Sequence, residues 1–359
     1  MKNTVFFFFL VLLSACVPGK DTSINTQAPL LATVPNESER LYFASVRDGV
    51  SSIAYLDLSC LEIQCLGKII LLPRVTLGDI ASQILWSPTG EFFFVASYLN
   101  GNMDILKSNA DGTDVRFLLN SADREEIIAQ SPNGNFVLFQ KDVIEGNNAY
   151  SQVWQVGIDG TNSQFLVNGC CAQWSSDANF IYYLDYFGAH LDIFRLSLND
   201  MLSENLTNSP QDEERDIAVS PDGTIIAYTV IKPDNNSVIY VMDKNGGGKV
   251  ELISNLPNAS QPVWSPDGTK IALISQSSNV TPAEIYVFDL EKRTYLNISN
   301  SPGFASHNPV WSPDGTQIAF DSLKDGNLDI YLVNSDGSNL IKLTNADNTT
   351  EFLFPSWQP

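Results

Sequence analysis

The sequence predicts an all-β protein, a seven-bladed β-propeller of four-stranded antiparallel blades, and three observations lead there. A phrase of the type W-S-P-D-G recurs seven times, with a tryptophan or its equivalent near 86, 130, 174, 219, 264, 311 and 357. The repeats follow one another every 44 to 47 residues, a length that holds four short strands and their turns. No helical pattern of a dozen residues interrupts them. The unit that fits these observations is a propeller blade.

The repeat that begins at Pro309 shows how each blade is built. The run "PVW" predicts a first strand, and "SPDG" predicts a tight turn in which Pro313 presets the first angle and Gly315 takes the left-handed position. In "DIYLVN" the side chains alternate, with Ile330 and Leu332 on one side of a strand and Tyr331 and Val333 on the other. The predicted second, third and fourth strands lie in 316–322, 329–334 and 339–344.

The two ends of the repeat array complement each other. The last phrase, "PSWQP", supplies only the first strand of a further blade. Residues 40–58 match a second and a third strand, and 68–72 match a fourth. Joined, the two ends complete one blade and close the ring, which leaves no open sheet edge. We therefore expect the propeller domain to span 40–359.

The first 39 residues predict export and a lipid anchor. Lys2 precedes nine apolar residues, Val5–Leu13, whereas a bilayer-spanning helix needs about 20. This pattern is typical of a signal peptide, here 1–15. "LSAC" resembles the bacterial lipoprotein signal, which implies that Cys16 is lipidated and that 16–39 form a flexible tether. The expected location is the extracytoplasmic side of the bacterial envelope; which membrane holds the anchor is left open.

The repeat resembles the TolB-type propeller repeat. The match is carried by the following residues: Trp311, Ser312, Pro313, Asp314, Gly315, Ile318, Ala319, Phe320, Asp329, Ile330, Tyr331, Asp336 and Gly337. The best-known members of that family are periplasmic proteins that bind other envelope proteins at the channel mouth of the propeller. This chain departs from them in its expected lipid anchor and in having seven expected blades where they have six. The resemblance therefore implies fold and compartment, and it leaves the partner open.

Four further cysteines are candidates for disulfides. Cys60 and Cys65 are spaced to staple a hairpin tip, and an exported protein can keep such a bond. Cys170 and Cys171 are adjacent, so they form either a strained small ring or two free thiols.

The charge balance favours a basic partner. The formal net charge is −21, from 41 acidic and 20 basic side chains. Such a surface repels phosphate backbones, which argues against nucleic acid and favours a basic protein segment or a cation. Solubility alone is the competing explanation.

The loops before the first strands predict an acidic rim around the channel. In a propeller these loops display variable residues, which supports a docking face for a basic segment of another envelope protein, with the propeller itself monomeric. Phe304 and Phe352 were expected to add apolar contact, and Cys170 and Cys171 fall on the same rim. Ordinary solvated loops are the alternative. The predicted rim residues are Asp123, Glu125, Glu126, Asp212, Glu213, Glu214, Asp216, His307, Glu351 and Phe352.

Catalytic and metal-binding patterns are weak, so we expect a non-catalytic binding module without a cofactor. Only two histidines occur, and neither a nucleophile elbow nor a phosphate-binding loop is present. Segments 100–104 and 325–329 resemble the start of a calcium loop, but turn formation by Asp, Asn and Gly explains them. Two alternatives stay open: a glycan- or peptide-processing enzyme with carboxylates at the channel mouth, and a structural component that uses the sides of its blades.

Overall fold

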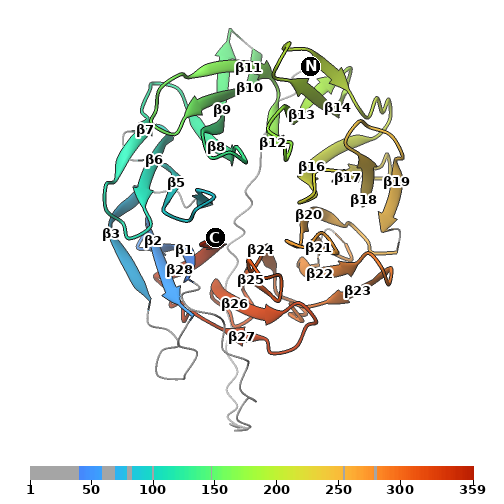
Figure 1. Cartoon of the computed structure of the whole chain (residues 1–359). Coiled ribbons are helices and arrows are strands. Elements are labelled where there is room, and N and C mark those ends of the chain that lie inside the picture. Colours follow the sequence, from blue (N-terminus) through green and yellow to red (C-terminus); the bar gives the residue numbers. More distant parts are fainter. Residues whose placement is uncertain are drawn as a thin grey trace. The chain divides into compact units, whose positions relative to one another are not determined.

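The computed structural model describes residues 40–58, 69–78, 83–98, 101–146, 148–253, 255–278 and 281–359. The chain divides into two compact units, Met1–Thr33 and Val34–Pro359, and all described residues belong to the second. This unit contains seven four-stranded antiparallel sheets arranged as blades around a ring, so the predicted seven-bladed β-propeller is confirmed (Figure 1). No helix among the described residues is long and apolar enough to cross a membrane.

Each blade runs from an innermost strand beside the central channel to an outermost strand at the rim of the ring (Figure 1). The first three blades in chain order, after the closing one, are β4 (Leu85–Trp86), β5 (Phe92–Ser97), β6 (Asp104–Asn109), β7 (Arg116–Leu119); β8 (Glu125–Gln130), β9 (Phe136–Glu145), β10 (Asn148–Gly157), β11 (Gln164–Asn168); and β12 (Cys170–Trp174), β13 (Phe180–Phe187), β14 (His190–Ser197), β15 (Ser203–Asn205). The next three are β16 (Glu213–Val219), β17 (Ile225–Ile231), β18 (Ser237–Asp243), β19 (Val250–Ile253); β20 (Ser260–Trp264), β21 (Lys270–Ser275), β22 (Glu284–Asp289), β23 (Thr294–Asn297); and β24 (Ser306–Trp311), β25 (Gln317–Ser322), β26 (Asp329–Asn334), β27 (Ile341–Lys342).

The seventh blade joins the two ends of the propeller. Its strand order is β28-β1-β2-β3, with β28 (Thr350–Trp357) innermost, followed by β1 (Arg40–Arg47), β2 (Val50–Asp57) and β3 (Ile70–Gly78). β28 pairs with β1 over almost its whole length, from Leu41 opposite Trp357 to Arg47 opposite Thr350. The predicted closure of the ring by the C-terminal strand is therefore confirmed.

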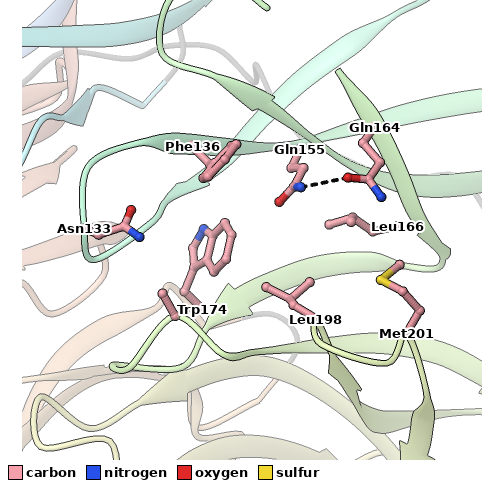
Figure 2. A pocket seen from close by; sticks show the side chains of 9 residues that line it. Asn133, Phe136, Gln155, Gln164, Leu166, Trp174, Leu198 and Met201 are labelled. Carbon is pink, nitrogen blue, oxygen red and sulfur yellow. Dashed lines mark hydrogen bonds between the residues drawn. The ribbon is translucent and has the colours of Figure 1, made fainter. Parts of the chain in front are cut away.

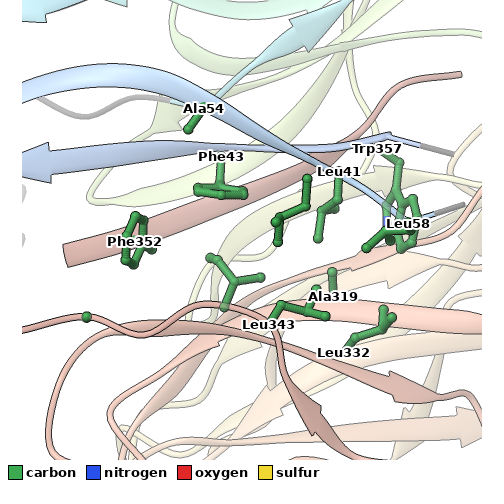
Figure 3. Packing of buried hydrophobic residues seen from close by; sticks show 12 residues of the cluster. Leu41, Phe43, Ala54, Leu58, Ala319, Leu332, Leu343, Phe352 and Trp357 are labelled. Carbon is green, nitrogen blue, oxygen red and sulfur yellow. The ribbon is translucent and has the colours of Figure 1, made fainter. Parts of the chain in front are cut away.

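Apolar side chains from this blade and the preceding one form a shared core (Figure 3). Leu41 and Phe43 of β1 and Phe352 of β28 lie against Ala319 and Leu332 of the sixth blade. The rings of Phe43 and Phe352 meet edge to face, with centroids 5.6 Å apart. Fully burying such a side chain stabilises the fold by about 1.5–3 kcal/mol, so packing between blades holds the ring closed.

The alternation seen in the sequence of β26 reflects two buried faces. Ile330 and Leu332 contribute to the core shared with the closing blade, whereas Tyr331 and Val333 pack against the blade before. Blades lie face to face around a propeller, so both faces of a middle strand are covered and both carry apolar residues.

The repeated phrase forms a turn held by its own side chains. In the sixth blade, Ser312 Oγ donates to Asp314 Oδ1 at 2.6 Å, and the Thr316 amide donates to the same carboxylate at 3.0 Å. Gly315 closes the turn at φ +70°. In the third copy Ala178 stands in the place of this glycine, at φ +56°.

The tryptophan of the phrase packs between blades, as its repetition predicted. Trp264 and Trp311 are buried, and each indole Nε1 donates to a backbone carbonyl of the preceding blade, at Ala218 and Val263, both at 3.0 Å. A large apolar side chain with one hydrogen-bond donor fits this position because its polar atom finds a partner on the neighbouring first strand.

Candidate interaction surface at the channel mouth

Antiparallel topology sorts the loops into two ends of the propeller. The loops that lead into each first strand share one end with the turns between second and third strands, and we call this end the mouth face. The S-P-D-G turns and the turns between third and fourth strands lie at the opposite end. All residues of the predicted rim are therefore near the mouth face, but their exposure differs.

Seven of the predicted rim residues reach solvent. Asp123, Glu126, His307 and Glu351 are exposed, while Asp212, Glu213 and Asp216 are half-buried. Partial loss of hydration raises the pKa of the Glu126 carboxyl and lowers the pKa of the His307 imidazole, because it disfavours the charged form of each group. Glu126 nevertheless keeps 49% of its side-chain area exposed, as expected for a group that lines an open channel.

Three predicted rim residues are buried, which corrects their assignment to the surface. Glu125 and Glu214 have 0% and 1% of their area exposed, and Phe352 has 5%. Side chains at the start of a first strand alternate between the channel and the space between blades, and these three point between blades. Phe352 belongs to the apolar core of the closing blade instead of the rim.

The two buried glutamates hold polar networks at the blade junctions. Glu125 accepts a hydrogen bond from Ser121 and lies 3.7 Å from the ammonium of Lys141. Desolvation raises the pKa of Glu214 to about 8, and a hydrogen bond shared with Asp192 acts in the same direction. Glu214 is therefore protonated at neutral pH and donates to Asp192, which is itself fully buried. Both carboxyl groups of this pair are closed off from any substrate in the channel.

Ion pairs neutralise part of the acidic mouth face. Arg124 binds Asp142 at 2.8 Å, Lys141 binds Asp123 at 2.9 Å and Lys232 binds Asp212 at 3.1 Å. Arg215 pairs with Glu213. Further exposed carboxylates surround these pairs and leave the face acidic: Asp48, Glu145, Asp234, Asp347 and Glu351.

Acidic residues at the opposite end have a different role. Hydrogen bonds from Ser220 and Ser265, followed by those from nearby backbone amides, hold the pKa of Asp222 and of Asp267 below its ordinary value. These carboxylates are engaged in forming turns. On the mouth face Asp234 and Asp347 are engaged in turns in the same way, whereas Glu126 and Glu351 are exposed on the channel strands.

The mouth face also exposes large apolar side chains that the sequence analysis missed, apart from Phe304. The missed residues lie in or beside the turns between second and third strands. At these places the alternating pattern of a strand does not show whether an apolar residue is covered by a neighbouring blade or exposed. An apolar residue next to such a turn, as in "VIEGN" and "YFGAH", was the available signal. The group, with exposed fractions of 38% to 78%, consists of Val50, Tyr98, Ile144, Tyr186, Phe187, Phe304 and Leu323.

Of the predicted disulfide and lipid positions, only Cys170 and Cys171 belong to the described residues. They are free thiols at the start of β12, with their sulfur atoms 3.0 Å apart. Cys16, Cys60 and Cys65 lie outside the described residues, as does the predicted signal peptide and tether.

The calcium-like segment 325–329 is satisfied by protein groups. Asp329 accepts hydrogen bonds from Thr344 and from the Ala346 amide, and its other oxygen lies 2.7 Å from the Lys342 ammonium. Across the described ranges, no group of three or more His, Cys, Asp or Glu side chains is arranged to hold a metal ion. Asn100 of the second such segment is not among those ranges.

Two hollows in the described part of the chain lie between neighbouring blades, away from the mouth face. One, of about 180 Å³, opens between the second and third blades and is lined by Asn133, Phe136, Gln155, Trp174 and Met201, among others (Figure 2). Its residues come from the turns opposite the mouth, and its polar lining consists of amides and the Trp174 indole nitrogen. It contains no charged group that could attract a charged ligand or act as acid and base.

Comparisons with known proteins agree with the repeat. Residues 259–359 match a family model described as the TolB beta propeller domain. The "Tol-Pal system protein TolB" of Francisella tularensis subsp. tularensis (strain WY96-3418) is 24% identical over 233 residues, which cover 52% of this chain and 53% of that protein. The chain thus spans about half the length of the curated relatives it matches.

Solved structures share the fold. TolB from Acinetobacter baumannii superposes with a TM-score of 0.54 at 15% identity, over 89% of this chain and 83% of that one. A Mycobacterium tuberculosis puromycin-hydrolyzing peptidase superposes with a TM-score of 0.66 at 12% identity, over 88% of this chain and 53% of that one. At these identities the likeness concerns the fold alone. The resemblance of the repeat to TolB-type propellers is confirmed.

Proposed function

We propose that this TolB-like propeller is a non-catalytic binding module that docks another envelope protein, or a basic peptide segment of one, on its mouth face. In this proposal the propeller is exported and tethered to a membrane through a lipid on Cys16, an expectation that rests on "LSAC" after the apolar run. The matched relatives are named as Tol-Pal system proteins, which supports an envelope setting.

The observation that carries the proposal is a set of exposed apolar side chains at the mouth face. Further exposed apolar side chains lie on the outer strands, among them Leu71, Phe165 and Leu296. Ile144 is 78% exposed, and Tyr186 and Phe187 are each 53% exposed, on neighbouring blades. Surface apolar residues scattered singly need no explanation, but a group at one end that is edged by charged residues is typical of a protein interaction site. Covering such a side chain with a partner yields about 1.5–3 kcal/mol, so a few of them suffice to anchor an interface.

The charges on the same face define the chemistry of the partner. Glu126 and Glu351 are exposed there, and the pairing of Arg124, Arg215 and Lys232 with carboxylates leaves acid in excess. Complementary charge mainly accelerates encounter and suppresses wrong partners, and it weakens with added salt. We therefore expect a partner that presents both basic and apolar residues to this face, and an association rate that falls as the salt concentration rises.

The buried position of the hydrogen-bonded pair Asp192 and Glu214 argues against acid–base catalysis by these two groups. Asp192 and Glu214 lie between blades with at most 1% exposed, so no substrate reaches them. A general acid or base must come within hydrogen-bond reach of the reacting atom. This is why binding is preferred over the glycan- or peptide-processing alternative.

Site-specific photocrosslinking in the native host tests the proposal. A photoreactive residue is placed at Ile144, Phe187 or Phe304 on the mouth face. The matched controls are Leu202, directly before the outer strand β15, and Val250 on the outer strand β19, with 67% and 55% exposure. We expect one and the same protein to crosslink from the mouth positions and not from the controls.

Two results would contradict this proposal. Crosslinks confined to the outer-strand positions would identify the blade sides as the interface and support the structural alternative. Crosslinks to the same proteins in equal yield from both sets would show that the mouth face has no preference for a partner.

A further inference from the structure

Two thiols meet at the mouth face although their residues are neighbours in a strand. Successive side chains of a regular strand point to opposite faces. Cys170 and Cys171 instead bring their sulfur atoms to 3.0 Å. The cause is a bulge in β12, where the pairing with β13 shifts between Cys170 and Gln173 and Cys171 adopts φ +58°.

The bulge is a property of the repeat, and only its chemistry is particular to β12. Three residues before the tryptophan position, four other first strands also place a residue at positive φ, namely Asp216, Gln261, Asn308 and Phe354. In the described part of the chain, β12 alone carries cysteine at this position and at the one before it. The fold thus provides a kink that turns two adjacent side chains to one side, and β12 fills it with two thiols.

The preceding residue makes room for this arrangement. Gly169 has φ +133°, and a Cβ there would lie 2.5 Å from the carbonyl oxygen of Leu184. Only glycine accepts both the angle and the close approach. The backbone on both sides of Cys170 is therefore held away from regular strand geometry.

The surroundings favour a thiolate on one of the two sulfurs. The hydrogen bond between the two thiols lowers the pKa of Cys171, and the guanidinium of Arg215 on the adjacent first strand adds to this effect. Burial and the carboxylates of Asp216 and Glu126 act in the opposite direction. Both cysteines keep part of their area exposed at the channel mouth, so a small reagent or a partner segment can reach them.

We propose that Cys170 and Cys171 form a thiol–disulfide exchange site that accepts the disulfide of an external molecule. The Cys171 thiolate attacks one sulfur of that disulfide, forms a mixed disulfide and releases the other sulfur as a thiolate. Cys170 then loses its proton to solvent and attacks the Cys171 sulfur, which forms the Cys170–Cys171 bond and releases the second thiolate. The two cysteines are oxidised and the external disulfide is reduced to two thiols.

Adjacency makes this exchange reversible. Consecutive Cα atoms are about 3.8 Å apart, closer than the separation that an ordinary disulfide prefers. Strained and exposed disulfides are the labile ones, whereas structural disulfides resist reduction. The site is therefore suited to cycling between two states at the mouth face and not to stapling the fold.

Oxidation with glutathione disulfide, followed by mass analysis, tests the proposal. The folded, fully reduced protein is incubated with glutathione disulfide, alkylated and digested with trypsin. Cleavage after Lys141 and Arg195 places Cys170 and Cys171 on one peptide, 142–195, separate from Cys60 and Cys65 on peptide 48–68. We expect peptide 142–195 to lose two hydrogen atoms and to carry neither glutathione nor the alkylating group.

Single variants distinguish ring closure from simple surface thiols. In Cys170→Ser the second step cannot occur, so the expected product is a lasting glutathione adduct on Cys171. An adduct that lasts equally well on the unsubstituted protein, or thiols that remain open to alkylation after oxidation, would overturn the proposal.

A rate comparison tests the role of the neighbouring charge. Replacing Arg215 with Gln removes a cation that favours the thiolate, so we expect the first step to slow by roughly threefold to tenfold at neutral pH. Arg47→Gln, on the closing blade at the same face, is the matched control and should leave the rate unchanged. Equal rates for both variants would show that Arg215 does not activate the pair.

Discussion

Glu214 offers a prediction that can be worked through in numbers. It is the second residue of the channel strand β16 and has 1% of its area exposed, and burial together with the hydrogen bond to Asp192 raises its pKa to about 8. The ordinary pKa is 4.5, so the unfolded chain has released this proton at pH 6 while the folded protein still holds it. A folded-state pKa above the unfolded one means that stability is greatest below pH 4.5 and is lost as the pH rises towards 8.

The size of the effect follows from proton linkage. Each pH unit between the two pKa values costs about 1.4 kcal/mol of unfolding free energy for one group. With a folded-state pKa of about 8, the loss from pH 6 to pH 8 amounts to about 2 kcal/mol. In Glu214→Gln the amide can still donate to Asp192 but cannot ionise, so this loss should disappear.

Guanidinium-induced unfolding at several pH values between 6 and 8 measures the difference. The expected result is that the unfolding free energy of the Glu214→Gln variant, relative to wild type, rises with pH by about 2 kcal/mol across this interval. Glu351→Gln, which replaces an exposed carboxylate of the same face, should follow the wild-type profile. If the unfolding free energies of wild type and Glu214→Gln change with pH in the same way, the conclusion that Glu214 is buried and protonated is refuted.

Three further predictions concern turns and packing in the blades, and denaturant unfolding measures each of them. Ala178→Gly should stabilise the protein by about 1 kcal/mol because Ala178 has φ +56°, and Gly134→Ala, at the equivalent position with φ +73°, should destabilise it by a similar amount. Destabilisation by Ala178→Gly, or stabilisation by Gly134→Ala, would contradict the shared turn. Phe352→Ala should cost about 3–5 kcal/mol because it empties the core that closes the ring, whereas Phe304→Ala, 43% exposed, should change stability by less than about 0.5 kcal/mol. Gly169→Ala should cost about 2–4 kcal/mol because its Cβ would meet a carbonyl oxygen at 2.5 Å, and an unchanged stability would mean that the bulge can relax.

The fold could be predicted because its signal repeats. The phrase around Trp311 encodes a strand, a turn with its own hydrogen bonds and a side chain that fills the space between blades, and each copy carries the same information. The closing blade was also accessible, since a missing first strand at one end and a surplus strand at the other complement each other. A copy that departs from the pattern, such as the one with Gln130 in the tryptophan position, does not obscure a signal that the other copies repeat.

The site was harder to predict because exposure depends on a one-residue difference. Glu125 and Glu126 follow each other, yet one points between blades and the other into the channel. Composition marks both as surface residues, and only the pairing register decides which one is buried. The same limit hid Ile144 and Phe187, since an apolar residue beside a tight turn is equally compatible with a covered and an open position.

A pull-down from native membranes with charge-reversed variants tests the central claim most directly. The mouth variant carries lysine at three positions that reach solvent, Glu126, Glu213 and Glu351. The control makes the same change in charge on the far end and outer edge, at Glu91, Glu251 and Glu291. If the mouth face is the docking surface, wild type and control recover the same specific protein and the mouth variant loses it. Recovery of that protein by all three, or its loss from the control alone, would contradict the account.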